Sequence, residues 1–499
     1  MAMRLTGLMS GMDTDSLIQE LVSARKTKVD QTVKAQKKLE VKQEAWKTLN
    51  GKLKTLQNKY ISNMRFSTAY MKKTTKVSNS NVASVITGEG AVNGVQELKV
   101  NKLAKTAYLT GAEIKKLDGG KVDANTKISE LGAISDSAKI SCTINGEVKD
   151  FEVTANTTIS EALTWLKDTC GLNASFDEKN QRMFVSAKES GKANDFTLSG
   201  EGRALTALGL SIKNNGANKI DGQDAEITLN GATFKSNTNT FDINGLTITA
   251  LSTTKENESV TVTTQDDTDG IYDMIKNFLK EYNSIINEMD KLYNADAAKG
   301  YEPLLDEEKE AMSESEIEKW EEKIKDSILR RDSNLSKVSS ALKQAMAGGI
   351  EIDGKTMYLS SFGISTMSYF QAADNEKNAY HIDGDADDEV TAGNADKLKS
   401  MISNDPDTVV SFFTQLSKNL YETMGNQSKS VDGYRSFGSF YDDKKLKTEY
   451  SDYTKKISQL EQKLADYEDK WYKKFAAMET AMAKMQSNTS AVTSLLGGM

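Results

Sequence analysis

The sequence predicts an α+β protein of several domains, in which long terminal helices form a coiled coil or helical bundle and β-rich domains are inserted in the middle of the chain. Three observations support this fold class: heptad-like apolar spacing near both ends, short alternating runs in the middle, and only two prolines among 499 residues. Because proline removes a backbone donor and interrupts helices, its scarcity permits long helices. The length is enough for roughly three domains.

The N-terminal stretch has the apolar pattern of a coiled-coil helix. Leu17 and Leu21 begin the stripe, and further residues spaced alternately by three and four continue it with one lysine among them. These further residues are Leu39, Lys42, Trp46, Leu49, Leu53, Leu56 and Tyr60. Asp13 to Asp15 precede the stripe, and Ser16 and Gln19 are spaced as a capping box, so we expect the helix to start there.

The C-terminal stretch repeats this pattern. Its seam consists of Leu446, Tyr450, Tyr453, Ile457, Leu460, Leu464, Tyr467 and Trp471. After one extra residue, which locally relaxes a supercoil, Phe475, Met478, Met482 and Met485 continue the stripe. Leu495 and Leu496 follow as a last apolar pair. We expect the two terminal seams to bury each other.

The middle of the chain has strand-like character. Within residues 77–265, runs such as 140–144 and 246–249 are alternating or β-branched, and Asn145-Gly146 and Asn230-Gly231 are turn signals between such runs. Helical periodicity returns at Ile271. The β region is therefore expected to be an insertion in a helical protein.

These patterns predict four parts. Residues 1–45 and 446–499 form the terminal coiled-coil helices, 46–76 and 266–445 a helical leg domain, 77–112 and 225–265 a β-rich head domain, and 113–224 an inserted β-rich domain.

Composition and charge exclude several classes of function. The net charge is -8, and an acidic chain lacks the basic surface that phosphate contacts need, so we expect no nucleic-acid partner. No apolar stretch is long enough to span a bilayer, so we expect no membrane insertion. The first residues lack the pattern of a Sec-type signal peptide.

Few side chains are candidates for catalysis or metal binding. With a single histidine, His381, neither a Ser-His-Asp nor a Cys-His triad is favoured. Four aspartates between 383 and 388 approach the spacing of a calcium loop, but Asp388 stands where that loop needs glycine and Asn394 where it needs glutamate. We therefore expect no catalytic, cofactor-binding or metal-binding residues and interpret these aspartates as a surface loop.

The cysteines Cys142 and Cys170 are too few for a disulfide framework or a zinc site. We interpret them as small buried apolar residues, and one disulfide stays open as an alternative.

Charge is unevenly distributed along the chain. Residues 25–59 hold eleven Lys or Arg against three Asp or Glu, whereas residues 302–326 hold four against eleven. A basic helix can bind nucleic acid or anionic lipid, but the apolar seam from Trp46 to Tyr60 favours a partner helix. The acidic stretch is expected to be a solvated face.

Ordered motifs carry a family resemblance. The chain opens with Gly7-Leu-Met-Ser-Gly-Met-Asp13 and an amphipathic run at 17–22. Further motifs follow at 224–231, 239–248, 278–285, 404–407 and 472–482, and residues 151–186 resemble the repeat module of flagellins and hook proteins. In this order they resemble the pattern of bacterial flagellar filament-capping proteins (hook-associated protein 2, FliD family). The acidic segment 298–325 is a departure that we do not place in that general pattern.

The resemblance implies a structural protein that is exported unfolded through the flagellar apparatus and acts outside the cell at the filament tip. It implies a homo-oligomeric ring, expected to be a pentamer, that promotes folding and insertion of flagellin and prevents its loss. Implied partners are flagellin, the hook–filament junction proteins and a flagellar export chaperone, with no cofactor. The alternatives are a tip adhesin that binds host mucin or glycans through the β domains, an enzyme carried on flagellar termini, and a cytoplasmic coiled-coil scaffold.

We assign two groups of site residues. Terminal-helix docking and self-assembly are assigned to Leu17, Leu21, Leu39, Trp46, Leu49, Leu53, Leu56, Ile457, Leu460, Leu464 and Trp471. A stripe shared by the chaperone and by docking is assigned to Phe475, Met478, Met482 and Met485. Because both seams lie outside the other domains in sequence, we expect residues 61–440 to fold without them.

Overall fold

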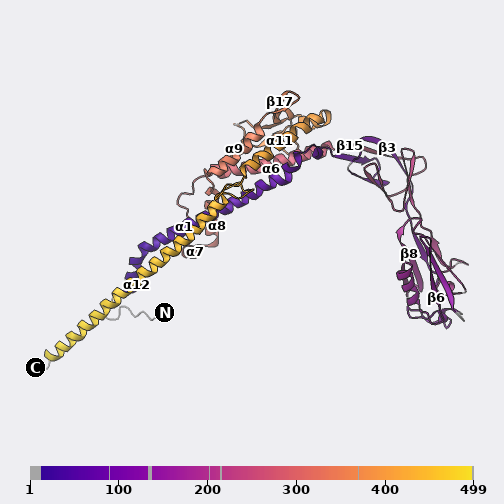
Figure 1. Cartoon of the computed structure of the whole chain (residues 1–499), viewed down its shortest axis with the longest axis horizontal. Helices are drawn as coiled ribbons and strands as arrows, with labels where there is room; N and C mark the ends of the chain where they lie inside the picture. The colour runs from indigo at the N-terminus through magenta and orange to yellow at the C-terminus, as the bar shows by residue number, and fades with distance from the viewer. Residues whose placement is uncertain are drawn as a thin grey trace. The chain divides into compact units, whose positions relative to one another are not determined.

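The computed structural model describes residues 13–88, 90–132, 137–201, 203–213, 216–368 and 370–496. The chain divides into two units, one formed by Met1–Tyr70 with Thr268–Met499 and the other by Met71–Asp267. Long terminal helices contact each other in the first unit, and the middle of the chain forms β-sheets in the second (Figure 1). The predicted α+β multidomain fold class is therefore confirmed.

The first unit is mainly helical. Its α-helices are α1 (Thr14–Thr55), α2 (Ser62–Met64), α6 (Thr268–Asn294), α7 (Asp306–Glu310), α8 (Glu314–Ser327), α9 (Ser333–Ala347), α10 (Lys397–Asn404), α11 (Pro406–Gln427) and α12 (Asp443–Leu496). Short 3-10 turns are η2 (Ser67–Tyr70) and η4 (Leu359–Phe362). Two small hairpins join β16 (Ile350–Ile352) to β17 (Lys355–Met357) and β18 (Ile364–Thr366) to β19 (Tyr380–Ile382). The helix α1 runs without a break across the domain boundary expected at 45/46.

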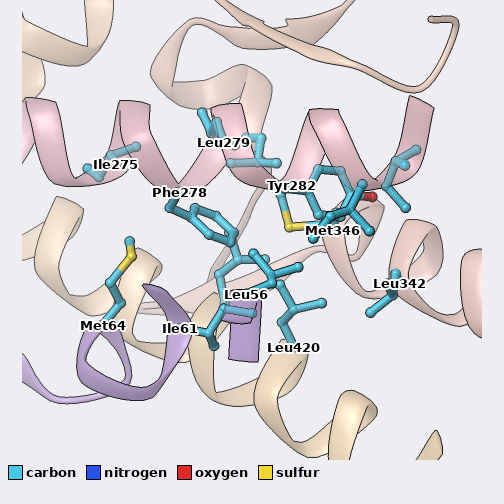
Figure 2. Packing of buried hydrophobic residues seen from close by; sticks show 14 of the residues in the cluster. Leu56, Ile61, Met64, Ile275, Phe278, Leu279, Tyr282, Leu342, Met346 and Leu420 are labelled. Carbon is cyan, nitrogen blue, oxygen red and sulfur yellow. The ribbon is translucent and has the colours of Figure 1, made fainter. Parts of the chain in front are cut away.

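The core of the first unit surrounds α6. Apolar residues at helical spacing bury one side of α6, as the periodicity from Ile271 onward predicts. Figure 2 shows Phe278 and Tyr282 of α6 pointing into a space filled by Leu56, Met346 and Leu420. Segments far apart in sequence therefore share one apolar core.

The seam of α1 ends in a π-helical turn, η1 (Leu56–Ile61). The heptad pattern predicts Tyr60 as the next seam residue, but Leu56 and Ile61 are the fully buried pair and Tyr60 is only half-buried. A π turn closes hydrogen bonds from residue i to residue i+5, so positions five apart share a face. The core therefore accommodates Leu56 and Ile61 together.

The second unit contains two β-rich cores. The first lies between a five-stranded sheet and a three-stranded sheet. The five strands, in order, are β1 (Lys73–Val77), β15 (Val260–Asp266), β3 (Gly94–Lys102), β11 (Ala225–Leu229) and β12 (Ala232–Ser236). The three strands are β13 (Thr240–Ile243), β14 (Leu246–Ala250) and β2 (Ala83–Thr87). Their buried residues include Leu98, Ile227 and Ile248.

The second core of this unit combines two further sheets with short helices. One sheet has the order β10 (Asn218–Ile220), β4 (Thr106–Thr110), β8 (Arg182–Ser190), β7 (Asn173–Asp177), and the other β6 (Glu147–Val153), β5 (Ala138–Ile144), β9 (Phe196–Gly200). The helices are α3 (Ile128–Leu131), α4 (Ile159–Thr164), η3 (Trp165–Thr169) and α5 (Ala204–Ala207). The sequence partition places 106–110 in the head domain, but β4 pairs with β8 and β10 here.

The hairpin signals in the sequence are confirmed. Asn145 and Gly146 have φ of 51° and 77° and join β5 to β6, and Asn230 and Gly231 have φ of 48° and 83° and join β11 to β12. Positive φ at both central residues matches the twist of the flanking strands, which is why Asn-Gly is favoured. Asn244 and Gly245 form a third turn of this kind between β13 and β14.

Candidate functional site: the paired terminal helices

Asp13 caps the N-terminus of α1. Its carboxylate accepts hydrogen bonds from the Ser16 backbone N–H at 3.0 Å and from the Ser16 hydroxyl at 2.6 Å. These bonds lower the pKa of Asp13 and satisfy a donor that the first turn leaves unpaired. The capping box expected at Ser16 and Gln19 is wrong: the helix begins earlier, at Thr14. The rest of the motif 7–13 lies outside the described residues.

The helices α1 and α12 pack antiparallel. Near the start of α12, the ring of Trp46 stacks on Tyr441, with centroids 5.4 Å apart. Further along, Gln36 Nε2 donates to Thr454 Oγ1 at 2.7 Å, and the Arg25 guanidinium lies 3.8 Å from the Tyr467 ring centroid. The numbers fall along α1 as they rise along α12. Figure 1 shows that α12 then continues past the first turn of α1.

The docking residues assigned to α1 occupy two different environments. Trp46, Leu49, Leu53 and Leu56 are at most 1% exposed and belong to the core of their own unit. Leu39 is half-buried. Leu17 and Leu21 are 39% and 40% exposed, while Ile18 between them is buried. The core residues therefore fix α1 in place, and Leu17 and Leu21 are the ones that present an apolar surface.

The apolar stripe of α12 is never fully buried within residues 443–493. Ile457, Leu460, Leu464, Trp471, Phe475 and Met478 are all half-buried. Further along, Met482 is 38% exposed and Met485 is 69% exposed. The side chains of Leu495 and Leu496 lie outside the described residues. A long helix with a stripe that stays partly exposed has apolar area left for another chain.

The first half of the acidic segment pairs with the basic face of α1, a contact that the expectation of a solvated face did not include, although its carboxylates stay exposed. Ion pairs join Lys26 to Glu307 at 2.8 Å, Lys34 to Glu308 at 2.6 Å and Lys37 to Asp306 at 3.0 Å. Lys37 also donates to the carbonyl of Leu304 at 2.9 Å, and Lys42 pairs with Asp332 at 2.7 Å. The opposite charges of 25–59 and 302–326 are the sequence signal that could have predicted this contact.

Three groups in these ion pairs, Lys26, Asp306 and Glu308, have shifted pKa values. The hydrogen bond from Lys34 lowers the pKa of Glu308, and the hydrogen bond from Lys37 lowers the pKa of Asp306. The Glu307 carboxylate raises the pKa of Lys26. All three shifts favour the charged forms, as expected when opposite charges come within hydrogen-bonding distance.

Comparison with known proteins identifies the family. Residues 222–487 match the family model described as the flagellar hook-associated protein 2 C-terminus, and residues 10–107 match that of its N-terminus. Together the two matches cover well over half of the chain. The chain belongs to the flagellar hook-associated protein 2 family.

Individual relatives are consistent with this family. The chain is 24% identical over 435 residues to flagellar hook-associated protein 2 of Halalkalibacterium halodurans, spanning 82% of this chain and 78% of that protein. It is 26% identical over 371 residues to the Thermotoga maritima protein of the same name, spanning 71% and 55%. The solved D1-D2-D3 domains of the flagellar cap protein FliD from Escherichia coli align with a TM-score of 0.50 at 18% identity, over 82% of this chain and 99% of that one. At this identity the last likeness shows the fold.

In this hook-associated protein 2 family member, three of the four aspartates in the loop 383–388 are paired with other side chains of the chain. Lys276 of α6 pairs with Asp385 at 2.5 Å and with Asp387 at 2.6 Å, and His381 Nδ1 lies 2.6 Å from Asp388. The lysine ammonium therefore supplies the positive charge that a bound cation would supply. No cluster of three potential ligands is found among the residues described here.

The structure also bears on membrane insertion. In the described part of the chain, no helix combines the length and the apolar character needed to cross a bilayer.

Proposed function

We propose that this chain caps the distal end of a bacterial flagellar filament. Its terminal helix pair would dock into the open filament end, and its β-rich unit would form the exposed plate under which exported flagellin folds and is inserted. The observation that supports this best is the stripe of α12, which is half-buried against α1 and then becomes more exposed at Met482 and Met485. Membership of the hook-associated protein 2 family supports the same role.

The cap would be a homo-oligomeric ring, with five subunits as our working expectation. Subunits in such a ring expose their helix ends together, so apolar residues that one chain leaves half-exposed would be covered by neighbouring chains. Leu17 and Leu21 on α1 and the stripe on α12 are the residues we assign to this contact. The hook–filament junction proteins and flagellin would supply the surrounding surface.

Before assembly, the same stripe would need a different partner. An exposed apolar stripe promotes non-specific association, and a cytoplasmic export chaperone would prevent this by covering it. Three of the four stripe residues are methionines, whose flexible thioether side chains repack against more than one partner. We therefore propose that chaperone and filament use Phe475, Met478, Met482 and Met485 in turn.

The test compares two double variants of the same turns of α12, one on the stripe and one at exposed positions beside it. Met482→Ser with Met485→Ser removes apolar surface from the stripe, and Ala481→Ser with Lys484→Ser is the matched control on exposed positions beside it. In a strain that lacks its own cap protein, the control should restore filament growth. The stripe variant should instead release flagellin into the medium and bind the chaperone more weakly.

Two outcomes would contradict the proposal. If the stripe variant is exported in equal amounts and still supports normal filaments, the stripe of α12 is not needed for docking. Lost docking with unchanged chaperone binding would restrict the stripe to assembly. No observation on the described residues favours the alternative of a tip adhesin, so we do not propose it as the function.

A further inference from the structure

The two cysteines of the chain meet in the second core of the β-rich unit. Cys142 lies on β5 and Cys170 directly follows η3, and both are free thiols. They are 0% and 3% exposed and belong to the same cluster of buried residues. Their sequence positions give no hint of this contact, because a strand, a hairpin and a helix separate them.

A π turn directs Cys170 toward the β5–β6 sheet. The Cys170 backbone N–H donates to the Trp165 carbonyl at 3.0 Å, a bond from residue i+5 to residue i. Such a turn returns residue 170 to the side of the helix that carries Trp165, whereas an ordinary α-turn would rotate it away. The Trp165 ring stacks on Phe151 of β6, with centroids 5.2 Å apart and planes 13° apart. This side of the helix therefore faces the sheet.

The strand brings Cys142 to the same place. Phe151 is directly opposite Ile140 in the β5–β6 pairing, and Cys142 is two residues further along β5, on the same face. Cys142 and Cys170 therefore both lie close in the chain to the Phe151–Trp165 stack, and both are buried in the core where the helix meets the sheet.

The two thiols contact each other directly. The Cys170 thiol donates a hydrogen bond to the sulfur of Cys142, which lowers the pKa of Cys142. The same hydrogen bond, together with burial, raises the pKa of Cys170. The thiolate is the reactive form of cysteine, so this arrangement favours Cys142 as the first nucleophile.

We propose that Cys142 and Cys170 form a dithiol site that low-molecular-weight disulfides oxidise to an intradomain disulfide. The Cys142 thiolate attacks one sulfur of the small disulfide and releases the other half as a thiolate. The Cys170 thiolate then attacks Sγ of Cys142 in the mixed disulfide and releases the second half. The two cysteine sulfurs lose two electrons and two protons, which leave with the oxidant as two small thiols.

The bond would fasten the short helix to the sheet. A cross-link restricts the unfolded chain more than the folded one, so it stabilises the domain if its geometry is unstrained. Because both sulfurs are buried, attack on the folded protein requires local opening, and oxidation should be slower than for exposed thiols. This inference concerns the β-rich unit alone and does not depend on the proposed capping role.

The test uses the full-length reduced protein in two arms with oxidised glutathione. One arm incubates the folded protein, and the other refolds it from urea in the same oxidant, so that burial cannot block the reaction. Trypsin separates the cysteines into peptides 140–149 and 168–179. We expect these peptides to be recovered as one linked species from a monomeric protein. The melting transition of this domain should rise by on the order of 10 °C.

Cys142→Ala and Cys170→Ala are the controls, and neither should yield a linked species or a rise in the melting temperature on oxidation. Three results would overturn the proposal: two free thiols after both arms, glutathione carried on either cysteine without an internal link, or dimers joined through these residues. Each would show that the two sulfurs do not reach bonding distance in the folded domain.

Discussion

At the scale of single residues, Arg435 is the side chain that fastens the long C-terminal helix to the core. Its guanidinium donates to Asp442 Oδ1 at 3.0 and 2.7 Å and to the carbonyl of Gln427 at 2.7 Å. Gln427 ends α11 and Asp442 immediately precedes α12. The planar fork of arginine fits several acceptors at once, which a lysine ammonium cannot reproduce.

We expect Arg435→Lys to lower the free energy of unfolding by about 2 kcal/mol, because one ammonium group cannot donate to all of these partly buried acceptors at once. The measurement is urea unfolding followed by circular dichroism. Arg330→Lys is the matched control at an exposed position, with an expected change within about 0.5 kcal/mol. Equal effects of the two substitutions would show that Arg435 does not anchor α12.

At the scale of elements, the contact between α7 and α1 explains the charge asymmetry of the sequence. Each helix alone carries an excess of one charge, and their pairing reduces the repulsion within both. Exposed ion pairs are individually weak, so the contact depends on several pairs acting together and on the Lys37–Leu304 hydrogen bond. These contacts therefore hold α7, in the first half of the acidic segment, against α1.

A charge reversal at this contact should release α7 from α1. We expect Glu308→Lys to place two positive charges together at Lys34 and to raise hydrogen exchange in residues 300–327, with α6 unaffected. Adding Lys34→Glu restores the opposite charges in reversed order and should return exchange toward the original rate. If the double variant exchanges as fast as the single one, the ion pair is not what holds α7.

Acid should weaken the same contact. The pKa values of Glu308 and Asp306 are lowered in the folded chain by hydrogen bonds from Lys34 and Lys37. Their contribution is complete above the ordinary carboxyl values of about 4 and is lost as the pH falls through the lowered values. We expect protection of α7 amides, corrected for intrinsic rates, to fall below pH 4 while α6 stays protected. If the protection of α7 amides does not change with pH, the carboxylates of Glu308 and Asp306 do not hold α7 against α1.

At the scale of the whole molecule, the first unit is assembled from both ends of the chain. The buried residues Trp46, Leu49, Leu53 and Leu56 pack into a core most of whose other members follow residue 270. Residues 61–440 lack these four core residues, so the structure leads us to expect that the helical unit does not fold in that fragment, contrary to the expectation from the sequence. Each lost large core side chain costs about 2–5 kcal/mol, and four such losses together are comparable to the usual stability of a domain.

We expect residues 71–267 to fold alone and residues 61–440 to leave the helical unit unfolded. The insert enters and leaves through neighbouring strands: β1 pairs with β15, and the Asp267 N–H donates to the Lys72 carbonyl at 2.9 Å. The folding of each fragment is measured by circular dichroism and by the dispersion of amide signals in NMR spectra. Cooperative melting of helical structure in 61–440 would show that α1 is dispensable to the core.

Some features follow from short-range rules and were therefore predictable. The strand alternation of 140–144 and 246–249, the Asn-Gly turns, and the helix from Ile271 depend on neighbours along the chain. Other features depend on distant partners. The π turn at Leu56–Ile61, the sheet that β4 joins, and the contact of Cys142 with Cys170 were not predictable from periodicity.

The sequence by itself determined the fold class, the helical ends, the inserted β region and the family resemblance, because periodicity and ordered motifs are local properties of the chain. Only the tertiary structure decided which apolar residues of α1 are core and which stay exposed. Trp46 and Leu17 belong to one continuous stripe in sequence, yet one is 1% and the other 39% exposed. Burial depends on what lies opposite a side chain, and at Trp46 that is Tyr441, which is brought there by the other end of the chain.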